Sequence, residues 1–366
     1  MNKLIRVLHF QGRMGLGGAE TFMMNTYRNI DRSKIQFDFL LYDDFKDVTP
    51  YNEEIKKLGG RIYYVPNPKK NIIKYVTSVS RLLKDHQFDI VHSQVFFGGG
   101  LNVWLAKRAG IKKRIVHSHA TSHEKEQNIV FKKVRAFLDQ LMFKYTTDYL
   151  ACSYDAGYAL FGHNHDFTFI PNGIDIDKYQ NIEESKNVIR NSLGIDGDTL
   201  VLGNIGRLEK QKNHSFLIEV FSKVKSKESD AILLLIGEGS LEQELKTLVE
   251  VKQLTDSVHF LGVRQDIPRM LKAMDIFIMP SLYEGLPISA VEAQAAGKKV
   301  VLSTEVSKET QLTDNVSFLS LDESIERWAE RTIQHPYQSH PLPTLELYDM
   351  NNTAIMMEKI YLNGSK

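Results

Sequence analysis

Cysteine is almost absent from this sequence, whose 366 residues include one, Cys152. A single cysteine excludes an internal disulfide and is typical of proteins in a reducing compartment. Long hydrophobic runs are lacking too. The N-terminal stretch MNKLIRVLHFQG carries Arg6 within a short apolar run, which fits neither a signal peptide nor a membrane-spanning helix. These absences predict a cytoplasmic protein. The short apolar run at the start of the sequence is interpreted as a first β-strand.

Several catalytic motifs are missing as well. The sequence has no GxxxxGK[ST] phosphate loop, no HExxH zinc motif and no GxSxG nucleophile elbow. The glycines near its start lack the GxGxxG spacing of a dinucleotide site. Cys152 lies in an apolar segment, which favours a packed side chain over a nucleophile.

Charge is nearly balanced overall, at a formal +1, but it is unevenly distributed. Residues 1–170 carry 25 Lys and Arg against 16 Asp and Glu, a net +9, which leaves −8 for the remainder. This asymmetry indicates that one half faces something anionic, although two solvated surfaces of different composition would also explain it. We expect no nucleic-acid partner.

Short apolar, β-branched runs alternate with helix-like stretches along the whole chain, and the pattern restarts after the segment FIPNGIDIDKY. Such alternation predicts parallel sheets covered by helices on both faces, hence two doubly wound, Rossmann-like α/β domains. We place them at residues 1–170 and 171–344, with a C-terminal helix at about 345–366 that can pack back on the first domain. Ligands of such sheets bind at the carboxyl ends of the strands, so two facing domains would enclose a cleft.

Two segments of the first half fall at expected strand ends. GRMGLGGAE, with Gly17 and Gly18, allows close approach of the backbone to a phosphate or sugar, but it also fits an ordinary strand–helix turn. RIVHSHA places His117 and His119 on one side of a strand. Zinc binding is possible, but no third ligand follows at a zinc-site spacing, and His117 is interpreted as a buried structural histidine.

In the second half, GNIGRLEKQKNH places Arg207 and Lys212 directly after a strand, and Gly237 follows the next strand. A guanidinium and an ammonium together can neutralise a pyrophosphate, whereas plain surface charges are the alternative. YEGLPISAVEAQAAG puts Glu284 before a helix that Pro287 would open, and Glu292 about one and a half turns inside it. The helix start offers unpaired N–H groups to an anion, so this segment suits a sugar nucleotide.

These segments together resemble the retaining glycosyltransferases of family four, which have the two-domain GT-B fold. The shared stretches are GGAE (17–20), VHSHA (116–120), IPNGID (170–175), GRLEKQKNH (206–214), IGEG (236–239) and the two glutamates, Glu284 and Glu292, with seven residues between them. The resemblance is closest to bacterial enzymes that build capsular or extracellular polysaccharide, through EAQAAG and the later Lys308 and Glu309. One departure is GKKVV, with Lys298 and Lys299, where the family usually has a G-x-P-V-V turn.

The resemblance implies a role for each matching residue. Glu284 would contact hydroxyls of the donor sugar, Glu292 those of the nucleotide ribose, and His119 would lie beside the sugar. The diphosphate would be held by Arg207 and Lys212 together with the backbone around Gly285, Leu286, Pro287 and Ile288. Gly17, Gly18 and Gly237 would also belong to the donor-binding site. No metal and no cofactor are expected, since no DxD-like pair follows a strand. The expected activity is hexosyl transfer with retention, from a nucleotide sugar (UDP is the common choice in relatives) to a glycan or lipid-linked oligosaccharide.

Other functions fit the same fold: a sugar-nucleotide epimerase, a phosphorylase, or a non-catalytic partner that binds nucleotide or glycan. The intact set of two glutamates and two basic residues argues against the last. A further expectation is reversible contact with an anionic membrane surface. It rests on the amphipathic stretch 128–150, on Lys69, Lys70 and Lys74, and on the cluster Lys112, Lys113 and Arg114. Packing of that helix on its own sheet is the alternative.

Overall fold

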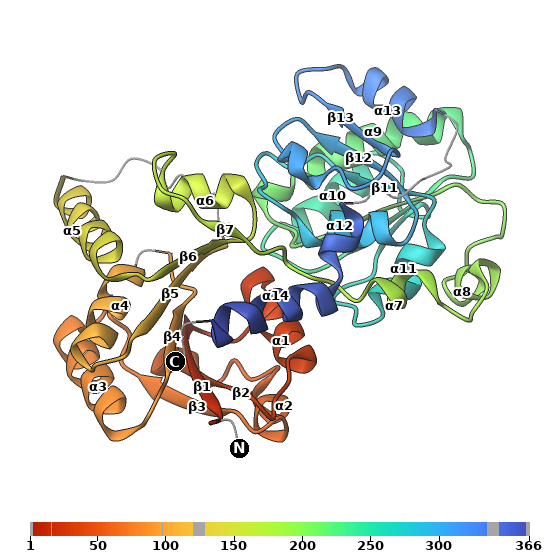
Figure 1. Ribbon diagram of the computed structural model, residues 1–366. Helices are drawn as coiled ribbons and strands as arrows, with labels where there is room; N and C mark the ends of the chain where they lie inside the picture. Colours follow the sequence, from red (N-terminus) through yellow and green to blue (C-terminus); the bar gives the residue numbers. More distant parts are fainter. Residues whose placement is uncertain (1–2, 16, 97, 120–128, 335–343, 364–366) are drawn as a thin grey trace. The chain divides into compact units, whose positions relative to one another are not determined.

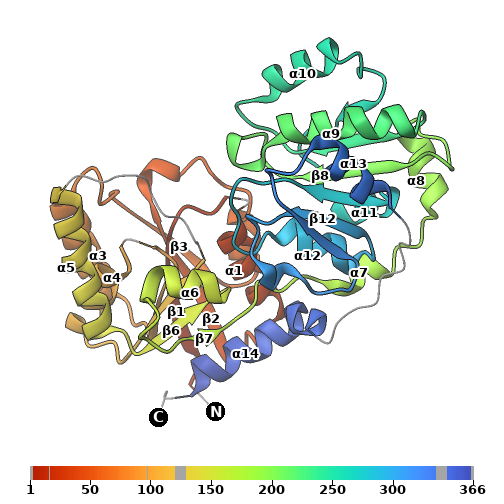
Figure 2. The same ribbon diagram turned by 90° about the horizontal axis from the view of Figure 1, so that it is seen from above.

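The computed structural model describes residues 3–15, 17–96, 98–119, 129–334 and 344–363. The chain divides into two compact units. Unit 1 comprises Met1–Gly173 and Asp349–Lys366, and unit 2 comprises Ile174–Tyr348. Each unit is built on one parallel β-sheet covered by helices (Figures 1 and 2). The prediction of two doubly wound α/β domains is confirmed.

Unit 1 contains a seven-stranded sheet in the order β3-β2-β1-β4-β5-β6-β7. Its strands are β1 (Ile5–Gly12), β2 (Ile35–Tyr42), β3 (Arg61–Val65), β4 (Ile90–Ser93), β5 (Lys113–Ser118), β6 (Asp148–Ala151) and β7 (Thr168–Phe169). Its helices are α1 (Gly18–Asn29), α2 (Asn52–Lys57), α3 (Ile72–Asp85), α4 (Gly99–Arg108), α5 (Ile129–Tyr145), α6 (Tyr154–Phe161) and α14 (Met350–Leu362), with a 3₁₀ turn at Asp43–Phe45. The order reverses between β1 and β4, which creates a switch point at their carboxyl ends.

Two hydrophobic cores lie on the two faces of this sheet. One is formed with α1 and α14, the other with α3 and α4. The C-terminal helix α14 therefore belongs to unit 1, and its Tyr361 is fully buried there, with its hydroxyl 2.7 Å from Nδ1 of His92. Helix α5 packs on α4, where a side chain at Gly100 would clash with the carbonyl of Leu138.

Unit 2 contains a six-stranded sheet in the order β10-β9-β8-β11-β12-β13. Its strands are β8 (Val201–Ile205), β9 (Ile232–Ile236), β10 (Val258–Phe260), β11 (Ile276–Met279), β12 (Lys299–Ser303) and β13 (Val316–Leu319). Its helices are α7 (Ile176–Gln180), α8 (Lys186–Ser192), α9 (His214–Lys227), α10 (Glu242–Val251), α11 (Ile267–Ala273), α12 (Ile288–Ala295) and α13 (Ile325–Ile333), with 3₁₀ turns at Lys210–Lys212, Lys308–Thr310 and Leu345–Tyr348.

Helices α9, α10 and α13 cover one face of this second sheet, and α8, α11 and α12 cover the other (Figure 2). The strand order reverses between β8 and β11. The loops that follow these two strands thus flank the switch point of unit 2, and they carry Arg207, Lys212 and Glu284.

Candidate functional site

The loops after β8 and β11 are joined by a nearly buried ion pair. Nζ of Lys212 lies 2.7 Å from Oε1 of Glu284, and these side chains are 14% and 12% exposed. Gln211 supports the pair, because its Nε2 donates to the same carboxylate oxygen at 3.1 Å and to the carbonyl of Tyr283 at 3.0 Å. The structure therefore brings two of the predicted site residues into direct contact.

Glycines allow the loop after β8 to pass close to its neighbours. The aliphatic part of the Lys212 side chain packs against Gly206, where an added Cβ would lie 3.0 Å from Cε of the lysine. Gly237 has φ +134°, and a Cβ there would lie 2.1 Å from the carbonyl oxygen of Gly206. Only glycine combines this conformation with so close an approach. Arg207, in the same loop, is exposed, so its guanidinium faces solvent.

The start of α12 lies beside Glu284 and has no side-chain cap. Pro287 is the N-cap and Ile288 the first helical residue, so the prediction that proline occupies the first helical position is wrong by one residue. Pro287 has no N–H, which leaves the N–H groups of Gly285, Leu286 and Ile288 as the donors that this segment can offer. The backbone of Glu284 is fixed by hydrogen bonds with Glu305 and Ser307.

Glu292 lies on α12 and does not contact Lys212 or Glu284 directly. Its Oε1 accepts a hydrogen bond of 2.6 Å from the hydroxyl of Tyr179, on α7. Burial raises the pKa of Glu292 to about 7, and the tyrosine hydrogen bond opposes this rise. Tyr179 was not predicted from the sequence, because 113 positions separate the two residues.

In unit 1, four histidines and Gln94 form a connected buried group at the ends of β1, β4 and β5. Ring centroids are 5.0 Å apart for His9 and His92, 5.4 Å for His92 and His117, and 4.1 Å for His117 and His119. The amide of Gln94 lies 3.2 Å from Nδ1 of His9 and 2.6 Å from Nε2 of His119.

Burial keeps these imidazoles neutral. It lowers the pKa of His119 to about 3, an effect that the Asn172 side chain opposes, and it lowers the pKa of His9 to about 3. His117 is fully buried, in keeping with the structural role predicted for it. A neutral His119 can donate a hydrogen bond to a hydroxyl or accept one from it, but it offers no positive charge to a phosphate.

The predicted glycine turn of unit 1 precedes α1. Gly17 is the N-cap, Gly18 is the first helical residue, and no side chain caps this helix. A Cβ on Gly17 would lie 2.5 Å from a carboxylate oxygen of the buried Glu20, so a larger residue here would require that side chain to shift. Within the described ranges, no group of three or more His, Cys, Asp or Glu side chains is placed to hold a metal ion.

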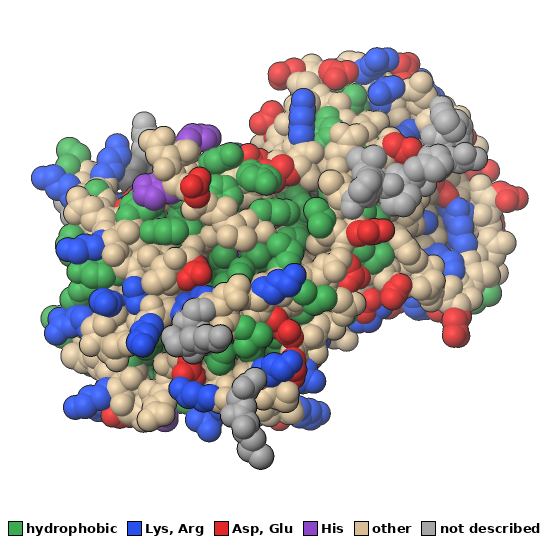
Figure 3. All heavy atoms as spheres, in the orientation of Figure 1, with side chains coloured by type: hydrophobic (Ala, Val, Ile, Leu, Met, Phe, Trp, Pro, Cys, Tyr) green, Lys and Arg blue, Asp and Glu red, His purple; other side chains and the backbone are tan. Residues whose placement is uncertain are grey.

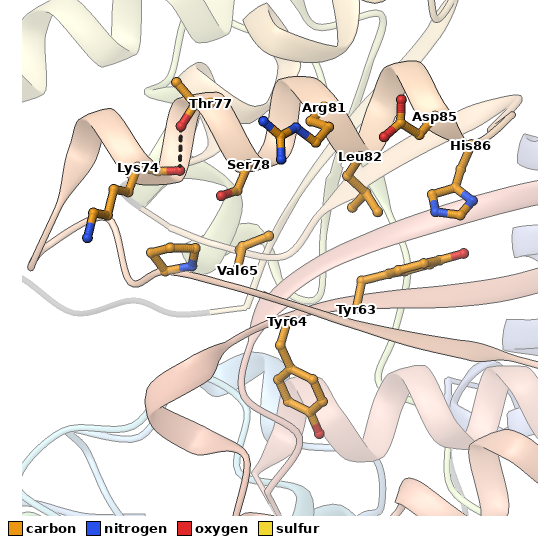
Figure 4. A pocket seen from close by; sticks show the side chains of 11 residues that line it. Tyr63, Tyr64, Val65, Lys74, Thr77, Ser78, Arg81, Leu82, Asp85 and His86 are labelled. Atoms are coloured by element: carbon orange, nitrogen blue, oxygen red, sulfur yellow. Dashed lines mark hydrogen bonds between the residues drawn. The ribbon is translucent and has the colours of Figure 1, made fainter.

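A separate hollow of about 390 Å³ lies between α3 and the edge strand β3 (Figure 4). Tyr63 and His86 meet at one end, and Lys74 and Arg81 project from α3. None of the predicted donor-binding residues lines it. The candidate site is therefore defined by the contacts around Lys212, Glu284 and Glu292.

Comparisons with known proteins agree with these features. The family described as Glycosyltransferase Family 4 matches residues 16–178, and Glycosyl transferases group 1 matches residues 185–334. EpsF of Bacillus subtilis (strain 168), named as a glycosyltransferase, is 36% identical over 332 residues, 89% of this chain and 86% of that protein. The UDP-Gal:alpha-D-GlcNAc-diphosphoundecaprenol alpha-1,3-galactosyltransferase of Escherichia coli is 28% identical over 313 residues, 82% of this chain and 79% of that protein.

The fold has solved counterparts as well. The crystal structure of HepE from Anabaena in complex with UDP superposes with a TM-score of 0.74 at 18% identity, covering 98% of this chain and 95% of that one. Likeness at this identity shows the fold, and the similarity to EpsF over most of both chains shows the family. The chain therefore belongs to the family-four glycosyltransferases, enzymes with the GT-B fold.

Proposed function

We propose that the chain is a retaining hexosyltransferase that moves a sugar from a UDP-sugar to a growing, lipid-linked glycan in bacterial polysaccharide synthesis. The observation that carries the proposal is the Lys212–Glu284 pair beside the uncapped start of α12. It places a cation for phosphate and an acceptor for sugar hydroxyls side by side. The UDP bound to HepE supports the donor, and the diphosphoundecaprenol acceptor in the name of the E. coli relative supports the acceptor.

In this proposal the positive groups act on the leaving diphosphate. Cleavage of the sugar–phosphate bond leaves negative charge on a phosphate oxygen and positive character on the sugar. Lys212, Arg207 and the N–H groups at the start of α12 stabilise that negative charge, which is the main electrostatic contribution to catalysis in such reactions. Glu284 accepts hydrogen bonds from sugar hydroxyls and Glu292 from ribose hydroxyls.

Retention of configuration then follows from attack on the face that the diphosphate leaves. The acceptor hydroxyl oxygen bonds to the anomeric carbon, the bond from that carbon to the phosphate oxygen breaks, and the departing oxygen takes the acceptor's proton. No carboxylate of the chain is required as a nucleophile. This fits Glu284, which the structure holds in an ion pair with Lys212.

A panel of sugar nucleotides tests the proposal. Each donor is scored for slow hydrolysis and for the rise in melting temperature that it produces. A ligand at about 100 times its dissociation constant adds roughly 2.7 kcal/mol to the free energy of unfolding. One UDP-sugar is expected to exceed the others in both measurements, and stabilisation by none of the panel would contradict a sugar-nucleotide enzyme.

Chelation gives a further prediction. We expect transfer to persist in excess EDTA, because Lys212, Arg207 and the start of α12 already place positive potential at the diphosphate. Initial rates with and without chelator are compared, with magnesium or manganese added back. Complete loss in EDTA that either ion restores would overturn metal independence.

We also propose that unit 1 contacts anionic membrane lipid, through a set of residues that differs in part from the predicted one. Lys113 and Arg114 are buried: Lys113 donates to the carbonyls of Ile360 and Asn363, and Arg114 donates to the carbonyl of Tyr145 at 2.6 Å. The predicted cluster Lys112, Lys113 and Arg114 is therefore not a surface patch. No helix in the described part of the chain combines the length and apolar character needed to span a bilayer.

The exposed candidates are on α5 and at the start of α3, along one side of unit 1 where hydrophobic and basic side chains are interspersed (Figure 3). On α5, Ile129, Val134 and Phe137 are 73%, 51% and 58% exposed. Lys132 and Lys133 on the same helix are exposed, as are Ile72 and Ile73 beside Lys69 and Lys74. Apolar side chains among lysines suit the headgroup region of an anionic bilayer.

Reversing the charges of α5 tests this surface. The double variant Lys132→Glu and Lys133→Glu is expected to lose most sedimentation with vesicles of anionic lipid, since each lysine contributes about 1 kcal/mol near such a surface. Lys57→Glu, on α2, is the control for charge reversal. Binding of the wild type should also weaken as salt rises. Equal binding to neutral vesicles, or none to anionic vesicles at low salt, would defeat the membrane proposal and leave the transferase proposal intact.

A further inference from the structure

Lys298 and Lys299, the two lysines at the turn after α12, have different environments. Nζ of Lys299 donates to the carbonyls of Arg331, Thr332 and Gln334 at 2.6–2.9 Å, so this lysine caps the end of α13. Lys298 is only partly exposed, and no acceptor within the described residues bonds to its ammonium. Lys299 therefore has a structural role as the cap of α13, whereas no such role accounts for Lys298.

The surroundings of Lys298 are strongly positive. Its nearest charged neighbours are Lys186, Arg190, Lys272 and one carboxylate, Asp275. That carboxylate is already engaged, because Lys186 donates to one oxygen and Arg190 donates to the other at 2.7 Å. Burial and these cations lower the pKa of Lys298 to about 8.

A cavity of about 360 Å³ opens at this cluster, within unit 2. Lys298 and Lys272 line it together with polar groups of Tyr179, Gln180 and Thr313. Lys272 and Lys298 are the charged side chains among its described lining residues, which include no Asp or Glu. The C-terminal end of α12 also borders the cavity, but its dipole is equivalent to only about half a negative charge. The charged side chains that line the cavity are therefore both positive.

We propose that this cavity is a second binding site, distinct from the Lys212–Glu284 site, which takes a small phosphate-bearing molecule between Lys298 and Lys272. A phosphate group supplies the acceptors that the ammonium of Lys298 lacks, and the hydroxyl and amide groups of the lining can bind the remaining oxygens. A volume of about 360 Å³ is sufficient for a phosphate with a small organic substituent.

The cavity is also connected to the candidate donor site. Tyr179 lines it and donates a hydrogen bond to Glu292 at 2.6 Å. A ligand that draws the Tyr179 hydroxyl towards itself would remove this bond and change the affinity of Glu292 for a ribose. This coupling rests on the proposed function, whereas the binding of phosphate in the cavity does not.

Inorganic phosphate is the probe for the binding step, titrated into the full-length protein at constant ionic strength with chloride as the reference anion. Lys298→Gln is expected to raise the dissociation constant of phosphate about tenfold or more, since it removes a charged donor. Lys272→Gln should do the same, Lys298→Arg should keep binding, and Lys227→Gln on α9 is the control. Melting temperatures close to that of the control show that the variants fold.

Lys212→Ala separates the two sites, because phosphate that binds in the cavity remains bound in this variant. Unchanged phosphate affinity in both Lys298→Gln and Lys272→Gln, or phosphate binding that Lys212→Ala abolishes, would overturn the second site. For the coupling, the dissociation constant of UDP is measured with and without saturating phosphate. A shift that vanishes in Lys298→Gln supports the link through Tyr179, whereas no shift in the wild type overturns that link and leaves the site itself standing.

Discussion

Replacing Lys212 by methionine is expected to lower the rate constant for sugar transfer by about 10²–10³, the usual cost of losing one group that stabilises developing negative charge. Methionine keeps the stem that crosses Gly206 and removes only the ammonium. The effect should appear in kcat as well as in kcat/KM, because negative charge on the diphosphate grows in the transition state. Steady-state kinetics with the best donor of the panel measure both.

Glu284→Gln should reduce transfer to a similar degree for a different reason. It removes the proposed acceptor for sugar hydroxyls and also leaves Lys212 without the carboxylate that lies 2.7 Å from it. The double variant should be little worse than either single one, since residues that act as a unit are not additive. A double-mutant cycle on kcat/KM shows this coupling.

Lys210 offers a matched control two residues away. It lies in the same 3₁₀ turn as Lys212 but is exposed. Lys210→Met should therefore change kcat by less than about twofold, because an exposed charge in this position is screened by solvent. Wild-type turnover in Lys212→Met or Glu284→Gln would remove the basis of the site assignment, and a large loss in Lys210→Met would show that the turn tolerates no change.

The fold was predictable because the same pattern, an apolar strand followed by a helix, is repeated along the chain. Each apolar strand and each following helix contributes the same evidence for a parallel sheet, so errors at single boundaries do not change the result. The start of α12 shows the scale of such an error: Pro287 is the N-cap instead of the first helical residue. The helix ends at Ala295 and is followed by Gly297, whose φ of +69° glycine adopts readily.

Side-chain partners were less predictable, because they come from distant segments. Lys113 and Arg114 read as a surface cluster, yet both cap backbone carbonyls inside unit 1, and the partners of Lys113 are about 250 positions away. The sequence signal that could have indicated burial is the position of both residues at the start of an apolar strand. The pairing of Tyr179 with Glu292 carries no local pattern at all.

The second prediction with a large expected effect concerns the protonation of Glu292 and its consequences for stability and donor binding. Its pKa of about 7 lies above the ordinary value of 4.5, so burial of this side chain favours its protonated form. Its contribution to stability is therefore fully present below about pH 4.5 and is lost as pH rises through 7, when this partly buried carboxylate has to ionise. The loss is of the order of 1–3 kcal/mol. Glu292→Gln should flatten this part of the stability curve of the unliganded protein, as measured by urea unfolding at several pH values.

Binding of the donor should show the opposite trend. Ribose hydroxyls donate to a carboxylate more strongly than to a protonated acid, so the affinity for a UDP-sugar is expected to fall as pH drops through about 7. Each phosphate of such a donor carries one ester and one anhydride bond and does not titrate near neutrality, so the titration of Glu292 is expected to be the one observed. Glu292→Gln should weaken donor binding about tenfold and abolish the pH dependence, with a smaller effect on kcat.

Tyr179→Phe distinguishes the titration of Glu292 from that of any other group. The tyrosine hydroxyl donates to Glu292 and thereby lowers its pKa, so its removal should move the midpoint of the binding curve above pH 7. Glu250→Gln, an exposed glutamate on α10, should leave the curve unchanged. Isothermal titration from pH 5.5 to 8.5 measures all four proteins. A midpoint that stays in place in Tyr179→Phe, or a pH dependence that survives in Glu292→Gln, would show that another group controls donor binding.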